Sequence, residues 1–190
     1  LWIIPESGPP LLPSRCKQAW QQLRFEPNLA VSTTVEAENL RLEQVAEVVP
    51  DQGRPCCQVR ARAESEQPAW LAIAIRPVNP EGISFIHRVS TAADGRQWLV
   101  NQQAGIELDK APERICMSTY AESDVLQKLP HAGQRPEAKC KVGLVTAAAL
   151  FRLRAGEPTA VRIRMPVRQG LPKSTRPAPV GAAQTQGESW

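Results

Sequence analysis

The sequence predicts an all-β fold, namely a two-sheet antiparallel β-sandwich with little helix. Two observations support this prediction. Short runs rich in β-branched and aromatic residues alternate with polar residues, and turn-forming residues interrupt these runs every ~8 to 12 residues. About nine or ten short strands with this spacing are typical of a sandwich whose two sheets share one core.

The stretch of residues 68–108 is central to this prediction because it contains three extended runs separated by turns. Residues 70–75 are almost continuously apolar, and residues 77–82 after them are dense in Pro, Asn and Gly. A second extended run follows, an Asp-Gly pair at residues 94–95 supplies a hairpin turn, and residues 98–100 return from it. We therefore expect these three runs to form an antiparallel meander.

The chain before this stretch is expected to begin irregularly and then enter a sheet. Residues 1–13 carry four prolines and one glycine among apolar residues, which predicts an irregular N-terminal arm. Residues 15–25 fit either a short helix or a turn leading into a strand. Residues 36–49 contain good helix formers, but residues 40–45 alternate between apolar and polar, so we expect a strand there. The clearer strand candidates are residues 29–35 and 57–63.

The chain after the meander is expected to contain further short strands and one helical segment. Ser123 is positioned to cap a helical segment over residues 123–129, with Val125, Leu126 and Leu129 facing inward. The strand candidates are residues 106–108, 115–117 and 159–167, with alternation in places across residues 138–153.

The last residues differ in composition from the rest of the chain. From residue 169 onward Pro, Gly, Ser, Thr, Ala and Gln dominate, as in a linker. The chain also begins at Leu1 rather than Met, so we expect it to be an excerpt of a longer protein. The predicted organisation is an irregular N-terminal arm (1–13), a β-sandwich domain (14–168) and a flexible linker or tail (169–190).

The charge pattern argues against nucleic acid and membrane as partners. The net charge is only +4, because 23 basic residues are mixed with 19 acidic ones. The most basic stretch, residues 152–168, contains no aromatic residue to stack on a base, and residues 161–165 alternate so that their arginines share one face of a strand. We interpret this as a solvated face. No apolar run approaches the length of a membrane span.

The cysteines and histidines predict neither a metal site nor a bound cofactor. There are five cysteines and two histidines, with no CxxC spacing. An odd and scattered set of cysteines suits a reducing compartment, which favours the cytoplasm over the periplasm. A disulfide between Cys116 and Cys140 remains an open alternative.

Three sequence segments together resemble a known group of enzymes. The segments are RPVNPEGIS (residues 76–84), YAESDV (residues 120–125) and VGLVTAAALF (residues 142–151), in this order. They resemble the N-terminal β-sandwich domain of glycogen-debranching and glucoamylase-like glycoside hydrolases. The resemblance implies a sandwich that packs beside a C-terminal helical barrel, whose loops carry the catalytic carboxylates. No such barrel is present in this sequence, so we assign no catalytic residue here.

Four residues are candidate ligand contacts, each with a simpler interpretation. Glu81 lies in a Pro/Gly loop where it could contact a sugar or a neighbouring domain, but exposed loop carboxylates are common. His87 has no visible partner for general-base chemistry. Trp98 could form a sugar-stacking platform with Trp70, although such tryptophans more often fill a sandwich core. Asn101 could join Glu81, His87 and Trp98 on one exposed surface.

These observations lead to two functional hypotheses. The first is a non-catalytic accessory β-sandwich of a carbohydrate-active enzyme, which docks on or orients a catalytic domain that is C-terminal to this chain. The second is a self-standing module that binds an oligosaccharide or a protein and exposes a tryptophan in the free domain. A structural domain of a bacterial surface or secretion assembly is a third alternative, and it predicts oxidised cysteines.

Overall fold

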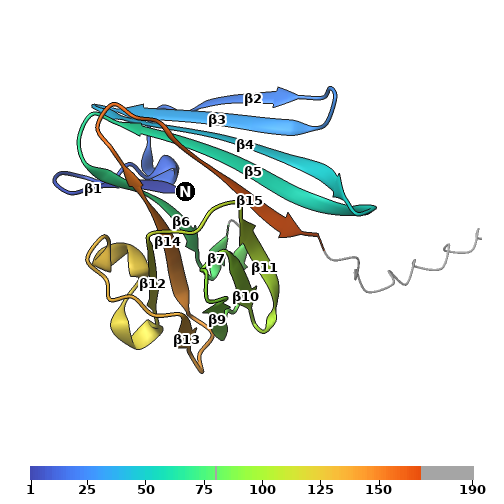
Figure 1. Cartoon of the computed structure of the whole chain (residues 1–190), viewed down its shortest axis with the longest axis vertical. Coiled ribbons are helices and arrows are strands. Elements are labelled where there is room, and N and C mark those ends of the chain that lie inside the picture. The colour runs from blue at the N-terminus through green and yellow to red at the C-terminus, as the bar shows by residue number, and fades with distance from the viewer. Residues whose placement is uncertain (80, 168–190) are drawn as a thin grey trace, which may run out of the picture.

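The predicted all-β sandwich is confirmed. The computed structural model describes residues 1–79 and 81–167, and it forms two large antiparallel sheets that face each other (Figure 1). The four-stranded sheet has the order β1 (Trp2–Pro5), β6 (Ala69–Ile75), β14 (Thr146–Leu153) and β12 (Arg114–Ser118). The nine-stranded sheet has the order β13 (Glu137–Lys139), β9 (Arg88–Thr91), β10 (Gln97–Val100), β11 (Gln103–Leu108), β15 (Thr159–Pro166), β5 (Arg54–Ser65), β4 (Leu40–Asp51), β3 (Ala30–Ala37) and β2 (Trp20–Arg24).

Short elements complete the fold at the ends of the sheets. A small antiparallel pair links β7 (Val78–Asn79) to β8 (Gly82–Ile83). Three 3-10 turns are η1 (Pro13–Arg15), η2 (Tyr120–Glu122) and η3 (Val125–Lys128). The predicted tail, residues 169–190, lies wholly outside the described residues.

The main core lies between the two sheets and follows from alternation along their strands. On the large sheet, inward residues such as Leu42 on β4, Ala61 and Ala63 on β5 and Ile163 on β15 are buried, whereas most of their outward neighbours are charged. On the small sheet, Ile3, Leu71 and Phe151 point into the same cluster. In the first half of β14 the consecutive alanines let the two layers approach closely, with Ala147 and Ala149 facing the main core.

The small sheet is buried on its other face as well. A second cluster there contains Trp2, Trp70 and Leu150, and it is covered by Leu12 from the N-terminal segment and Val125 from η3. Strands β6 and β14 therefore need apolar residues on both faces. This requirement explains why their sequences read as continuous apolar runs instead of alternating ones.

The expected meander is wrong in its first strand. The run at residues 70–75 forms β6, which pairs with β1 and β14 in the small sheet. The run that begins at residue 83 divides into β8 and β9, and the actual meander is β9–β10–β11 in the large sheet. A strand that is apolar on both faces lies inside the doubly covered sheet, whereas the alternating strands belong to the singly covered one.

Two local expectations also differ from the structure. Residues 1–13 do not form a wholly irregular arm, because β1 pairs with β6 from Trp2 to Pro5. Ser123 does not cap a helix, since its φ of 79° breaks the backbone between η2 and η3. The cap is Asp124, whose Oδ1 accepts a hydrogen bond from the Leu126 N–H at 2.9 Å.

The open choices made from sequence are settled by pairing. Over residues 15–25 the chain leaves the turn η1, which ends at Arg15, and forms strand β2 from Trp20, while residues 40–51 form strand β4 despite their helix propensity. Register explains the second result, because β4 pairs along its whole length with β5 and along most of it with β3. Pairing on both sides outweighs the intrinsic helix preference.

We predict that Trp98→Ala lowers the free energy of unfolding by about 3–5 kcal/mol, as large-to-small changes of buried aromatic residues do. Trp98 is 1% exposed, and its Nε1–H donates to the Gly95 carbonyl at 2.8 Å. The measurement is urea denaturation followed by circular dichroism. The matched control is Trp20→Ala, because Trp20 is 78% exposed and its removal should change stability by less than about 0.5 kcal/mol. Equal effects of the two changes would contradict the assignment of Trp98 to the core.

Candidate functional site

Of the four candidate ligand contacts, Trp98 is not available to a ligand. Its ring fills the space between the sheets and its indole N–H is used by the Gly95 carbonyl. Trp70 is also buried, on the outer face of the small sheet. A platform formed by these two tryptophans is therefore absent, because both rings satisfy the apolar demand of the fold before any ligand can reach them.

His87 and Asn101 are brought together by backbone contacts. The Asn101 Oδ1 accepts hydrogen bonds from the N–H groups of His87 (2.8 Å) and Arg88 (3.2 Å), while its Nδ2 donates to the Phe85 carbonyl (3.0 Å). Asn101 has a φ of 51°, a conformation that asparagine tolerates better than most residues. Its amide thus ties the turn after β10 to residues 85–88. The His87 ring is exposed and lies 6.2 Å from the Phe85 ring, centroid to centroid.

Glu81 lies apart from that pair, in the turn between β7 and β8. Asn79 holds this turn, because its Oδ1 accepts from the Glu81 N–H at 2.9 Å and its Nδ2 donates to the Ser84 hydroxyl at 2.9 Å. The turn is exposed, and so is Glu81. Glu81, His87 and Asn101 therefore lie on exposed connecting segments, whereas Trp98 is buried in the core.

The three segments that carry the family resemblance meet in space. The Arg76 guanidinium donates from Nε (2.9 Å) and Nη2 (2.6 Å) to the Asp124 carboxylate, which joins the first segment to the second. The Val125 N–H donates to the Thr146 hydroxyl at 2.9 Å, which joins the second to the third. The Ile86 N–H donates to the Gly143 carbonyl at 2.7 Å, beside the end of the first segment. One corner of the domain is thus built from all three.

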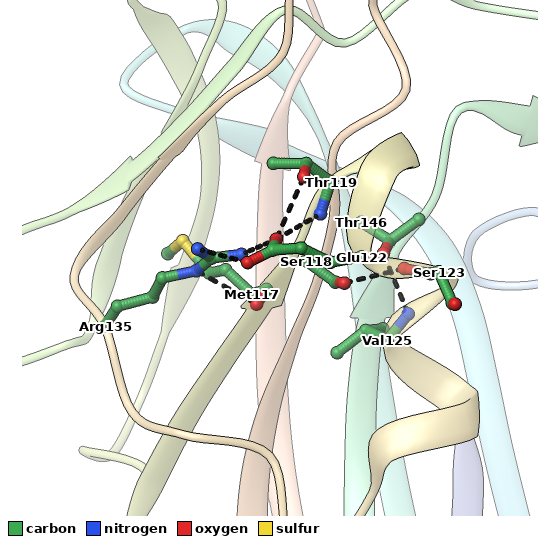
Figure 2. A network of polar contacts seen from close by, with 8 residues as sticks. All are labelled: Met117, Ser118, Thr119, Glu122, Ser123, Val125, Arg135 and Thr146. Carbon is green, nitrogen blue, oxygen red and sulfur yellow. Dashed lines mark hydrogen bonds and ion pairs between the residues drawn. The ribbon is translucent and has the colours of Figure 1, made fainter.

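A polar network fixes η2 at this corner (Figure 2). The Glu122 carboxylate accepts from Arg135 at both oxygens (3.2 and 2.5 Å) and from the N–H (3.0 Å) and hydroxyl (2.9 Å) of Thr119. Arg135 also donates to the Met117 carbonyl at 3.0 Å, and the Ser118 hydroxyl donates to the Ser123 carbonyl at 2.6 Å. The Arg135 hydrogen bonds lower the pKa of Glu122 to about 2. The loop that carries Tyr120 is therefore held in place by charge-assisted hydrogen bonds.

The corner contains a shallow cavity of about 320 Å³ with an aromatic side chain at its mouth. Tyr120 is 69% exposed, and Val78 from β7 lines the same cavity. The sequence offered no signal for Tyr120 as a candidate, because a single tyrosine beside a turn is indistinguishable from any exposed aromatic residue. The cavity combines apolar and hydrogen-bonding groups, supplied by Pro77, Val78, Thr119, Tyr120, Ser123, Asp124, Gln127, Leu144 and Thr146.

A second surface arises because the large sheet runs past the small one. Strands β2 to β5 project beyond β6 and β14, so part of their inner face has no covering layer (Figure 1). We call this uncovered inner face the overhang and define it by Leu23, Val31, Ala46 and Val48. Its residues share the inward face with the buried Leu42, as the alternation along β4 requires.

The overhang continues the apolar core outward in register. Leu23, Val31, Ala46, Val59 and Ile163 are opposite one another on five neighbouring strands. Exposure rises along this row from 4% at Ile163 to 39% at Val31 and 51% at Leu23, and Val48 in the next row is 52% exposed. Ile163 and Val59 also line a mainly apolar cavity of about 400 Å³ between the sheets. The row of inward apolar side chains is thus longer than the small sheet can cover.

The cysteines and acidic residues of the described part of the chain form neither a disulfide nor a metal site. All five cysteines are free, so Cys116 and Cys140 are not bridged, and the buried Cys116 thiol instead donates to the Ala132 carbonyl at 3.6 Å. Within residues 1–79 and 81–167, no group of three or more His, Cys, Asp or Glu is placed to hold a metal ion. No helix in the same residues is long and apolar enough to cross a membrane.

Comparison with known proteins gives little that bears on function. No protein-family model matches the chain, and no curated protein matches it. A matching solved structure is described as "Putative kojibiose phosphorylase from human microbiome", with a TM-score of 0.46 and 10% sequence identity. The match covers 87% of this chain and 21% of that protein, so the chain spans about a fifth of its length. Similarity at this level does not establish a common activity.

We predict that Glu122→Gln lowers the free energy of unfolding at pH 7 by about 1 kcal/mol, a modest value because solvent screens this half-exposed ion pair. The folded-state pKa of Glu122 is depressed to about 2 from 4.5, so its contribution is complete above pH 4.5 and is lost as the pH falls toward 2. The stability difference between the two proteins should therefore shrink over that window in thermal unfolding. Glu157→Gln is the control, since Glu157 is 66% exposed and pairs with Arg154 at 3.7 Å. A difference that stays constant down to pH 2 would contradict the network.

Proposed function

We propose that this chain is a non-catalytic accessory β-sandwich of a carbohydrate-active enzyme, which docks on and orients a catalytic domain. The observation that carries this proposal is the overhang. Four apolar side chains on the projecting strands lie on the inward face, with exposures that reach 52%, and they extend a row that is buried elsewhere in the same domain. Contiguous exposed apolar surface of this kind marks a contact with another protein surface.

The energetic argument favours a partner of large and mainly apolar surface. A polar face would be enough if these strands only had to be soluble, and the outer face of the same strands is indeed polar: Arg60 pairs with Glu47 at 3.1 Å and Arg164 with Asp51 at 2.6 Å. On β3 and β4 the large apolar residues that are exposed, Val31 (39%) and Val48 (52%), both lie on the inner side. Covering them removes apolar area from water and adds about 25 cal/mol per Å² to association.

The link to carbohydrate chemistry rests on the three segments that resemble the debranching and glucoamylase-like group. The hydrogen bonds between Arg76 and Asp124 and between Val125 and Thr146 join these segments into one rigid corner. In the proposed arrangement the sandwich supplies shape and position. The carboxylates that cleave the glycosidic bond belong to the partner domain, which we propose to be C-terminal to this chain.

The gene provides the first test. Sequencing the region after the codon for Trp190 should show a domain of amphipathic helices long enough to form a helical barrel, encoded in the same reading frame. A reading frame that ends at Trp190, with no such domain encoded beside it, would contradict the proposal.

We predict that Val48→Asp weakens binding to the catalytic domain at least about tenfold, equivalent to about 1.4 kcal/mol. Val48 is 52% exposed on the overhang, and docking would bury the new carboxylate without a partner. The measurement is titration calorimetry between the two separately expressed domains. Val49→Asp is the matched control, because the same change at the next residue points to the opposite face of β4. Equal loss of binding in both variants would rule out the overhang as the docking surface.

A second candidate function is a self-standing module that binds a carbohydrate or a protein; it is favoured by the exposed Tyr120, and the exposed tryptophan that it predicts is Trp20. An exposed aromatic ring beside a cavity with hydroxyl and amide groups can stack on a sugar and bond to it. The accessory function predicts no saturable heat on titration with α-glucan oligosaccharides. The module predicts binding that Tyr120→Ala abolishes and Tyr120→Phe retains, because the phenylalanine keeps the ring.

A further inference from the structure

Strand β2 is an unprotected edge of the large sheet. It pairs with β3 and with no other strand among the described residues, and all five of its residues are exposed. Natural edge strands are commonly protected by lysine, proline or a bulge. The sequence of β2, Trp-Gln-Gln-Leu-Arg, contains no lysine and no proline, its one charged residue is Arg24 at the end of the strand, and its register with β3 is uninterrupted. The strand therefore offers backbone groups and side chains to another strand.

The direction of the free backbone groups follows from a contact with β3. The Ser32 hydroxyl on β3 donates to the Gln22 carbonyl at 3.4 Å, so this carbonyl is turned toward β3. Alternate residues of a strand direct their N–H and C=O groups to opposite sides. The N–H and C=O groups of Gln21 and Leu23 consequently face the free edge, where they can form hydrogen bonds with an added strand.

We propose that the occupant of this edge is a second copy of the chain, paired antiparallel through β2 about a two-fold axis at Gln22. In this register Gln22 lies opposite Gln22 of the second copy, and Gln21 lies opposite Leu23 of the second copy. Trp20 lies opposite Arg24 of the second copy, and the same pair occurs twice by symmetry. The residues whose backbone groups face outward, Gln21 and Leu23, then form the hydrogen-bonded pairs of the new ladder.

The strand is self-complementary in this register. Trp20, 78% exposed, and Arg24, also exposed, lie on the same outer face of β2, two residues on either side of Gln22. Arg24 takes part in no ion pair among the described residues. Pairing about Gln22 places each guanidinium over the indole of the other copy, where the ring attracts a cation. It also keeps the two Arg24 side chains at opposite ends of the interface.

The domain already uses this pairing inside its small sheet. Trp70 on β6 and Arg152 on β14 are direct antiparallel partners, and the Arg152 guanidinium carbon lies 4.9 Å from the centre of the Trp70 ring. Directly opposed tryptophan and arginine side chains therefore stack in an antiparallel pair of this protein. The proposed contact repeats that geometry between two copies, at the one tryptophan whose ring is left uncovered among the described residues.

A cysteine placed on the axis tests the register. Opposed residues of the non-hydrogen-bonded type have Cα atoms ~4.5 Å apart, within the range of about 4.4–6.8 Å that a disulfide requires. Gln22→Cys should therefore give a covalent dimer under mild oxidation on a denaturing gel without reductant. Gln21→Cys is the matched control, because position 21 opposes position 23 and not itself. The unmodified chain, with its five free cysteines, gives the background. A yield for Gln22→Cys that does not exceed that of Gln21→Cys would overturn the proposed pairing.

Sedimentation of the full chain over a range of concentrations tests the side-chain contact. We expect a reversible dimer whose dissociation constant rises at least tenfold in Trp20→Ala and in Arg24→Glu. Phe25→Ala should leave it unchanged, since Phe25 is 73% exposed but lies outside the paired strand. Val48→Asp, on the inner face, should also leave it unchanged, which separates this contact from docking through the overhang. A monomer at every concentration, or equal weakening by Phe25→Ala, would overturn the proposal.

Discussion

The constraint on which the rest of the structure depends is that the small sheet is covered on both faces. Its inner face meets the large sheet, and its outer face meets the N-terminal segment and the loop around η3. Because β6 and β14 are apolar on both faces, other elements must pack against each face. The second cover brings Asp124 close enough to pair with Arg76 and brings Val125 to the hydroxyl of Thr146. The candidate corner is therefore a by-product of burying two apolar strands.

The opposite situation holds at β2 to β5, where one layer lacks a cover. Nine strands face four, so the larger sheet must either turn polar on its inner face or leave apolar residues exposed. The sequence does the second: Val31 and Val48 lie on the same inward face as the buried Leu42 but are 39% and 52% exposed. In an isolated domain this arrangement increases the apolar area in contact with water. It becomes favourable when another surface completes the sandwich.

The sequence was informative about features that depend on the residues of one strand alone. Alternation identified β4 and β5 and predicted the all-β class, because period-two burial is a local property of a half-buried strand. It did not show which sheet a strand joins, and so β6 was grouped with β9 and β10 although it pairs with β14. The sheet that a strand joins depends on pairing with strands that are distant in the sequence, and the composition of the strand itself does not predict that pairing.

The candidate site was harder to predict for a related reason. Trp98 and Tyr120 are both aromatic residues beside turns, yet one is 1% exposed and the other 69%. The difference arises because the facing sheet covers Trp98 and no layer of the described residues covers Tyr120. Asp124 and Ser123 are both good capping residues, and the choice between them depends on the left-handed φ of Ser123. Contacts between distant segments, such as Glu122 with Arg135, decide these cases.

The edge of β2 and the overhang are adjacent, and this adjacency relates the two proposed contacts. In the antiparallel pairing about Gln22, outer-face residues oppose outer-face residues, so the inner faces of both copies lie on the same side of one continuous sheet. Leu23 begins the apolar row in each copy, and the two rows flank the axis, each Leu23 lying opposite Gln21 of the other copy. A pair of copies thus presents two overhangs held side by side. If each overhang docks on one catalytic domain, the two domains are held at a fixed separation, and contact with a branched or polymeric substrate at one of them raises its effective concentration at the other.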